Sequence, residues 1–157
     1  MRYGCIIWGN KGSRFRTFIC NLQNKAMKIM CFADRLDSSK PLFAKLGIIQ
    51  FLDVVHLENI LFSHAFVTKS LPTSFSEFFL LENNVHRYET RRTVNVFFNV
   101  KMVNSTRYGN SIKSLCVTSW NSLLLAHPNI DFQIIKRANL LNLMRIDFIN
   151  SYKAVLV

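Results

Sequence analysis

The chain has 157 residues, of which half are hydrophobic and fourteen are phenylalanine. This length suits one domain, and this apolar content excludes an intrinsically disordered chain. The formal net charge is +11, which favours phosphate-rich partners because each neutralised phosphate releases counterions; a solvated basic surface without a ligand is the equal alternative.

The charge is unevenly spread along the sequence. Residues 1–50 carry nine Lys or Arg and two acids. Residues 51–100 carry four Lys or Arg and five acids, and residues 101–157 carry seven Lys or Arg and two acids. Two basic ends therefore flank a neutral and apolar middle. No secretory signal and no apolar run of about 18 residues is present, so we expect an intracellular protein, nuclear or cytoplasmic, without a membrane partner.

Residues 14–33 are the stretch around which the chain is organised. Their apolar residues recur at steps of three and four, which fits one face of a helix and no strand: Phe15, Phe18, Ile19, Leu22, Ala26, Ile29, Met30 and Ala33. At about 100° per residue, Arg14, Lys25 and Lys28 fall along one flank of that face. We expect a core-forming helix with an apolar stripe and a basic edge.

Three more helices are expected before the middle of the chain. Residues 41–46 begin with a favoured Pro41 and end at Gly47 as a left-handed cap. Residues 52–69 are apolar on nearly all sides and should form the most buried helix, in which Glu58 needs a basic partner, the first helix being the obvious source. Residues 74–81 can form a short helix capped by Ser74.

The second half of the chain begins with a different pattern. Apolar and polar residues alternate over residues 94–103, which is the only strand-like signal. The helical period returns from Ser111 to Pro128, and a last helix is expected to start near Asp131, a good cap. We therefore expect a mainly α single helical domain over residues 1–157, with a short extended or β segment near residues 94–103. The helix over 14–33 should pack on the helix over 52–69, and the last two helices should complete the core.

No complete catalytic or metal site is visible. Residues 32–35 read FADR, so the adjacent aspartates of a polymerase metal site are absent, and Asp34 and Asp37 are better explained as loop acids. His56 and His64 are eight residues apart, farther than a helical zinc pair. The four cysteines have no metal-ligand spacing and are expected to be packed thiols. No cofactor, metal or small-molecule substrate is expected.

One polar connector has the chemistry of a nucleic-acid contact. Residues 86–92 read HRYETRR, in which arginine forks suit phosphate oxygens and aromatic rings can stack on bases. A hydrogen-bonded connector in which Arg91 tethers the loop is an equal alternative. Trp120 lies at a core-facing helical position, so a core anchor is favoured there over base stacking. The candidate phosphate contacts are Lys25, Lys28, Arg87, Arg91, Arg92 and Arg107.

The ordered series of short motifs resembles the region downstream of the polymerase core in reverse transcriptases of non-LTR (LINE-type) retrotransposons. The matching pieces cover nearly the whole chain: YGCIIWG at 3–9, LQNKAMKI at 22–29, PLF at 41–43, LGI at 46–48, HRYETR at 86–91, YGNSI at 108–112 and WNSL at 120–123. Two departures concern the helix near Trp120. The usual glycine before the Trp-Asn pair is replaced by residues 115–119, and residues 124–128 stand where Leu-Pro is usual.

The resemblance implies a post-thumb piece of an RNA-directed DNA polymerase. In that family the palm and fingers precede this region, so the catalytic aspartates have no counterpart here and the chain is not expected to be an enzyme by itself. We expect a fragment truncated at its N-terminal end that binds the RNA or DNA backbone of a template or primer, with the missing upstream polymerase domain as a second partner. The alternative is an inactive scaffold or interaction remnant of a truncated mobile element. A free-standing hydrolase or nuclease has only Asp34, Asp37 and the histidines in its support.

Overall fold

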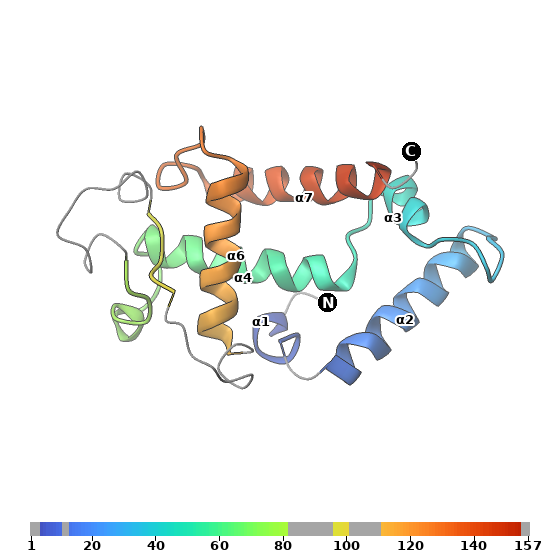
Figure 1. Ribbon diagram of the computed structural model, residues 1–157, viewed down its shortest axis with the longest axis horizontal. Coiled ribbons are helices and arrows are strands. Elements are labelled where there is room, and N and C mark those ends of the chain that lie inside the picture. Colours follow the sequence, from blue (N-terminus) through green and yellow to red (C-terminus); the bar gives the residue numbers. More distant parts are fainter. Residues whose placement is uncertain (1–3, 11–12, 82–95, 101–110, 155–157) are drawn as a thin grey trace. The chain divides into compact units, whose positions relative to one another are not determined.

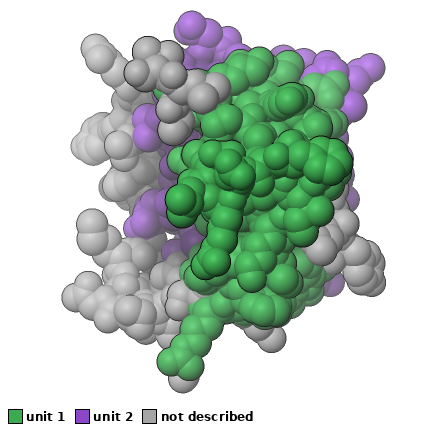
Figure 2. Space-filling view, turned by 90° about the vertical axis from the view of Figure 1, so that its right-hand side faces the viewer, with its two compact units in different colours: residues 1–57, 141–157 green, residues 58–140 purple. Residues whose placement is uncertain are grey.

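A computed structural model of the chain describes residues 4–10, 13–81, 96–100 and 111–154. These residues are mainly helical, as expected, with six α-helices and one short 3₁₀ helix among them (Figure 1). They form two compact units, the first from residues 1–57 and 141–157 and the second from residues 58–140 (Figure 2). Helices α4 (Phe51–Val67) and α7 (Arg137–Lys153) contribute residues to both units.

The first unit is built from α1 (Cys5–Trp8), α2 (Ser13–Met30), α3 (Lys40–Leu46), the start of α4 and the end of α7. One apolar cluster joins α1 to α4, where Cys5 packs on Phe51 and Val55 and the Trp8 ring stacks on Phe51 with centroids 5.5 Å apart. A second cluster joins the buried side chains of Met27, Phe43 and Tyr152, which come from α2, α3 and α7. The expected contact of the first helix with the start of α4 is present, through Ile19 and Cys20.

Two glycines position these short helices. Gly47 has φ 62° and ends α3, where the N–H of Ile48 bonds to the carbonyl of Phe43, so the predicted left-handed cap is confirmed. Gly9 lies against α4, and a Cβ atom built on it would come within 2.5 Å of a Val55 methyl carbon. The close approach of α1 to α4 therefore depends on the missing side chain at Gly9.

The second unit contains the rest of α4, the 3₁₀ helix η1 (Thr73–Phe75), α6 (Ile112–Ala126) and the start of α7. Its core is strongly aromatic: the Phe79 and Phe98 rings stack with centroids 4.5 Å apart, and Trp120 is fully buried. Helix α6 begins at the expected place, because the Ser111 hydroxyl accepts a hydrogen bond from the Ser114 N–H at 3.2 Å. Helix α4 is largely buried along its length, as predicted, with Leu57, Ile60 and Leu61 at most 2% exposed.

Two helix boundaries expected for the second half of the chain are corrected. The helix predicted over residues 74–81 is only the single turn η1, because the chain then turns to place Phe79 in the aromatic core. The last helix begins at Arg137 instead of near Asp131, whose carboxylate accepts a hydrogen bond from the Gln133 N–H in a local turn. The expected short extended segment is present in its described part, residues 96–100, where Phe98 forms an isolated antiparallel bridge with Leu81.

The orientation of the first helix is also corrected. Helix α2 forms as predicted, but most of its apolar stripe faces outward: Phe18, Leu22 and Ile29 are 60%, 50% and 75% exposed, whereas Ile19 packs on the cluster at the start of α4. The opposite side packs on the protein, with Met27 only 3% exposed and Gln23 half-buried. Periodicity located the stripe correctly, but the stripe is not the core-forming face.

Within the described ranges, no single helix is long and apolar enough to cross a membrane. Helices α3 and α4 meet that criterion only as a pair, and the pair is bent by 62°.

Candidate nucleic-acid interface

Helix α2 carries the two predicted phosphate contacts that the structure describes. Its eighteen residues include four cations, Arg14, Arg16, Lys25 and Lys28, and no acid. Lys25 is exposed, so its ammonium group is available to an anion. Lys28 is half-buried, and its Nζ donates a hydrogen bond to the Arg35 carbonyl at 2.7 Å. Lys28 therefore holds the turn after α2 in addition to any contact with phosphate.

The other four predicted contacts, Arg87, Arg91, Arg92 and Arg107, lie outside the residues that the structure describes. The structure thus places two of the six candidate phosphate contacts on one helix. That the other four lie close to them stays a prediction. The cation excess belongs to both units: the first contains eleven Lys or Arg and four acids, and the second contains nine and five.

The pair Asp34 and Asp37 forms a turn. The N–H of Asp34 bonds to the Asp37 carboxylate at 2.9 Å, the N–H of Asp37 bonds to the Asp34 carbonyl at 3.2 Å, and both residues are exposed. This geometry agrees with the predicted loop acids, because the Asp37 carboxylate satisfies a backbone donor in the chain itself. Asp34 and Asp37 therefore give the nuclease hypothesis no support as a metal site.

A group of polar side chains that sequence reasoning missed lies in the first unit. Tyr152 donates a hydrogen bond to the Asp53 carboxylate and accepts one from the Gln50 N–H at 3.1 Å. Burial, followed by the hydrogen bond to Asp53, raises the pKa of the Tyr152 hydroxyl well above its usual value. No local motif signals this group, because Asp53 and Tyr152 are 99 residues apart in the sequence.

Asp53 also acts electrostatically on two other side chains of the first unit, Cys20 and His56. Burial raises the pKa of the Cys20 thiol, although the nearby Arg16 opposes this shift. Burial also lowers the pKa of His56, with Asp53 opposing it. A reactive cysteine needs a lowered pKa, so the shift at Cys20 is opposite to the one that a nucleophile requires.

In the second unit the buried polar side chains are bonded to the chain itself. His64 is 4% exposed and its Nε2 lies 3.0 Å from the Ile135 carbonyl; burial lowers its pKa. The Ser63 hydroxyl donates to the Asn59 carbonyl at 3.0 Å, and burial raises the pKa of the Cys116 thiol to about 12. His64 and Cys116 are therefore uncharged near pH 7.

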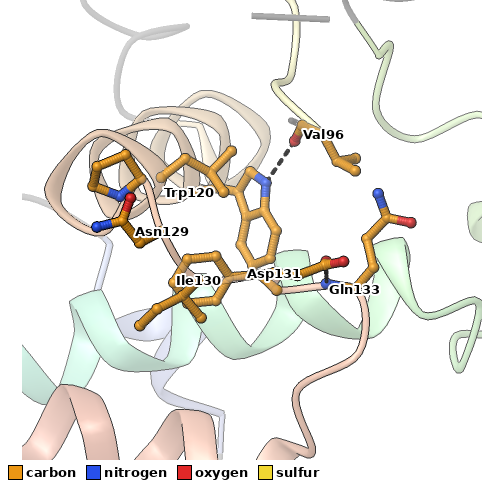
Figure 3. A pocket seen from close by; sticks show the side chains of 9 residues that line it. Val96, Trp120, Asn129, Ile130, Asp131 and Gln133 are labelled. Carbon is orange, nitrogen blue, oxygen red and sulfur yellow. Dashed lines mark hydrogen bonds between the residues drawn. The ribbon is translucent and has the colours of Figure 1, made fainter. Parts of the chain in front are cut away.

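Two cavities open in the second unit. The first, of about 240 Å³, lies between Trp120 and the turn over residues 128–133; its close-up shows the Trp120 indole N–H directed at the Val96 carbonyl, 2.8 Å away (Figure 3). The second, of about 560 Å³, is lined mostly by apolar side chains, including Phe66, Phe75 and Leu81. Among the described residues, the first cavity is lined by no serine, threonine or cysteine, and the second is lined by Lys69, Thr73 and Ser76 in addition to its apolar side chains.

Two side-chain amides from the sequence motifs have clear structural roles. Gln23 accepts a hydrogen bond from the Phe51 N–H at 2.8 Å and donates to the Ile49 carbonyl at 3.1 Å, so it satisfies a free donor at the start of α4. Asn121 pairs with the N–H and carbonyl of Phe98 at 3.0 and 2.9 Å. Together with the fully buried Trp120, which is the predicted core anchor, Asn121 holds the extended segment against α6.

Among the residues that the structure describes, no three His, Cys, Asp or Glu side chains are grouped so that they could hold a metal ion. Comparison with known protein families, with curated proteins and with solved structures finds no match.

Proposed function

We propose that the chain is a non-catalytic nucleic-acid-binding segment corresponding to the C-terminal, post-thumb region of a non-LTR retrotransposon reverse transcriptase. In this role it contacts the phosphate backbone of a template or primer. The ordered motif series supports the family, and the net charge of +11 supports the ligand class. The observation that carries the proposal is α2, which combines four cations with no acid and exposes Arg14 and Lys25.

The proposal assigns the polymerase chemistry to another domain. The two acids that follow α2 in the sequence, Asp34 and Asp37, bond within their own turn. Asp53 is engaged by Tyr152. An upstream polymerase domain is accordingly a proposed partner, and the chain itself is proposed to position nucleic acid without reacting with it.

A second candidate function is an interaction remnant with no ligand of its own. The exposed apolar stripe of α2 favours it, because large apolar patches on a protein surface mark contact sites for other proteins. The two functions are separated by whether nucleic acid binds at all.

Fluorescence anisotropy with a single-stranded RNA and the same sequence as DNA tests the proposal on α2. Lys25→Gln should weaken binding and reduce the magnitude of the log–log salt slope by about 0.7, since one phosphate contact is lost. Lys45→Gln is the matched control, because Lys45 is exposed on α3 in the same unit and is not a proposed contact. Equal losses from both variants would mean that binding depends on net charge and not on α2.

The four arginines are tested as a group. Replacing Arg87, Arg91, Arg92 and Arg107 by Gln should reduce the slope magnitude by up to about 2.8, which is four contacts at about 0.7 each. An unchanged slope would remove these residues from the interface and leave α2 as its only proposed part.

A further inference from the structure

The larger of the two cavities described above has an apolar floor and a polar rim. Its volume of about 560 Å³ lies within the range of about 300–1,000 Å³ that is usual for small-molecule sites. The floor consists of half-buried apolar side chains of the second unit: Phe66, Val67, Leu71, Phe75, Leu81 and Val96. The rim carries exposed polar side chains of the same unit: Lys69, Thr73, Ser76 and Gln133. Such a cavity suits a ligand with an apolar body and a polar head.

The charge at the rim selects the kind of head. Among the described residues that line the cavity, Lys69 is the one cation and there is no acid. Three acids adjoin lining residues in the sequence: Glu77, Glu82 and Asp131. Glu82 lies outside the described residues, and within the described ranges no ion pair joins Lys69 to an acid. Asp131 accepts a hydrogen bond from the Gln133 N–H, so an anionic head is placed at Lys69 and not at Gln133.

Lys69 is held in a backbone conformation that normally belongs to glycine. Its φ is 53°, and it follows α4 in a Schellman turn, in which the Ser70 N–H bonds to the Ala65 carbonyl at 2.9 Å and the Lys69 N–H to the Phe66 carbonyl at 3.0 Å. A lysine within the last turn of α4 would complement the helix dipole without this strain. Strained residues cluster at ligand sites, so the strain and the cavity point to the same residue.

The end of α4 is prepared for an anion by its own side chains. The last carbonyls of a helix carry partial negative charge, which opposes a carboxylate. Here the Thr68 hydroxyl donates a hydrogen bond to the His64 carbonyl at 2.9 Å, and the Ser70 hydroxyl donates one to the Ala65 carbonyl at 3.0 Å. These bonds satisfy carbonyls that would otherwise face the rim, so the ammonium group of Lys69 is the dominant charge there.

We propose that this cavity binds a medium-chain fatty acid, with the alkyl chain on the apolar floor and the carboxylate at Lys69. The single ammonium group matches a single carboxylate, and the hydroxyls of Thr73 and Ser76 can donate further hydrogen bonds to it. The floor gives a sugar or a nucleobase no polar side chain to bind, whereas it buries an alkyl chain.

The aromatic residues of the floor favour an alkyl chain over an aromatic ligand. The Phe66 ring already packs edge-on against Phe79 with centroids 5.0 Å apart, and the Phe75 ring packs edge-on against Phe62 with centroids 5.7 Å apart. A flexible alkyl chain adapts to rings whose orientation is fixed, whereas a second aromatic group needs a particular geometry to stack. The site lies in the second unit and α2 lies in the first, so this proposal does not rest on the proposed phosphate contacts.

Titration of the intact chain with octanoate, followed by methyl NMR, tests the site. The methyl signals of Val67 and Leu71 should shift in a saturable way with a dissociation constant of about 0.1–1 mM, as is usual for a ligand of this size. The methyl signals of Leu22 and Ile29, which are exposed on α2, should not shift. Inorganic phosphate should leave all four signals unchanged, since it has no apolar body.

Variants at Lys69 test the carboxylate contact. Lys69→Gln should raise the dissociation constant for octanoate about 2- to 5-fold, which is the effect of a solvent-exposed ion pair, and Lys69→Arg should bind as wild type does. Lys136→Gln is the matched control, because Lys136 is exposed in the same unit and does not line the cavity. Octanol has the same chain without the charge, so wild type and Lys69→Gln should bind it equally.

Lys69→Gly separates binding from stability. The midpoint of urea denaturation should rise, because glycine adopts this conformation without strain, and octanoate binding should weaken as much as in Lys69→Gln. A Lys69→Gly chain that is stabilised but still binds octanoate as wild type does would show that Lys69 has no part in the site.

Three other results would overturn the proposal. The first is the absence of methyl shifts at about 10 mM octanoate. The second is an equal loss of binding in Lys69→Gln and Lys136→Gln, which would mean that octanoate responds only to the net charge. The third is a shift of the Val67 and Leu71 methyl signals with single-stranded RNA and not with octanoate, which would assign the cavity to nucleic acid.

Discussion

Phe32 occupies a backbone conformation that usually belongs to glycine. Its φ is 51°, and it follows α2 at the position where a left-handed residue ends a helix, with the Ala33 N–H bonded to the Lys28 carbonyl at 3.0 Å. The residue is 98% exposed, so no packing of its side chain within the chain offsets the strain of this conformation. The residue is locally unfavourable, and the sequence alone does not reveal this because φ depends on where the helix stops.

Phe32→Gly should therefore stabilise the chain. We expect a gain of about 0.5 kcal/mol in the free energy of unfolding, since relief of the left-handed strain exceeds the entropy that glycine adds to the unfolded state. Phe32→Ala is the control: it removes the exposed ring and keeps the strain, so it should change little. Urea denaturation measures both variants, and a stabilised Phe32→Ala with an unchanged Phe32→Gly would contradict this explanation.

The buried histidines predict the pH dependence of stability. Burial holds the pKa of His64 and of His56 below the ordinary value of 6.5. Below that pH the unfolded chain binds protons that the folded chain refuses, so this part of the stability is complete above about pH 6.5 and is lost as the pH falls below it. Urea denaturation should show a free energy of unfolding that decreases from about pH 7.5 to about pH 5.5. His64→Gln should show a smaller decrease, and an equal decrease would exclude His64 as a cause.

At the scale of elements, the sequence predicts which segments are helical better than it predicts which side of each helix is buried. Helices α2, α3, α4 and α6 lie where periodicity and capping residues place them, because these signals are local. The direction of α2 is not local: Gln23 bonds to the backbone around Phe51, and Met27 packs on Phe43 and Tyr152, which turns the apolar stripe outward. The contact partners are distant in sequence, so no pattern within α2 predicts them.

Gln23 offers an element-scale test. Gln23→Leu removes the partners of the Phe51 N–H and the Ile49 carbonyl, and each unsatisfied group costs about 1–3 kcal/mol. Hydrogen exchange should show faster exchange of the Phe51 amide, together with a loss of stability of about 2–4 kcal/mol. Gln23→Glu keeps the acceptor for Phe51 and should lose less. Full protection of the Phe51 amide in Gln23→Leu would show that Gln23 does not hold the start of α4.

At the scale of the whole molecule, the composition predicts a phosphate-rich ligand but does not predict which residues bind it. The charge excess is visible in the sequence, and two of the six proposed contacts, Lys25 and Lys28, prove to lie on one helix without acids. Lys28 also donates a hydrogen bond to the Arg35 carbonyl. The helical periodicity does not predict this bond, because the bond depends on the conformation of the turn after α2. The motif residues Gln23, Trp120 and Asn121 hold backbone segments in place, so in this chain they serve the fold.

The salt dependence of binding to single-stranded RNA tests the central claim most directly. The intact chain should bind with a log–log slope near −4 if the six cations each neutralise one phosphate at about −0.7 per contact. Binding should be measured at two or more salt concentrations with the same oligonucleotide and with its DNA counterpart. A slope near zero, or no binding at low salt, would contradict a role in holding a template or primer.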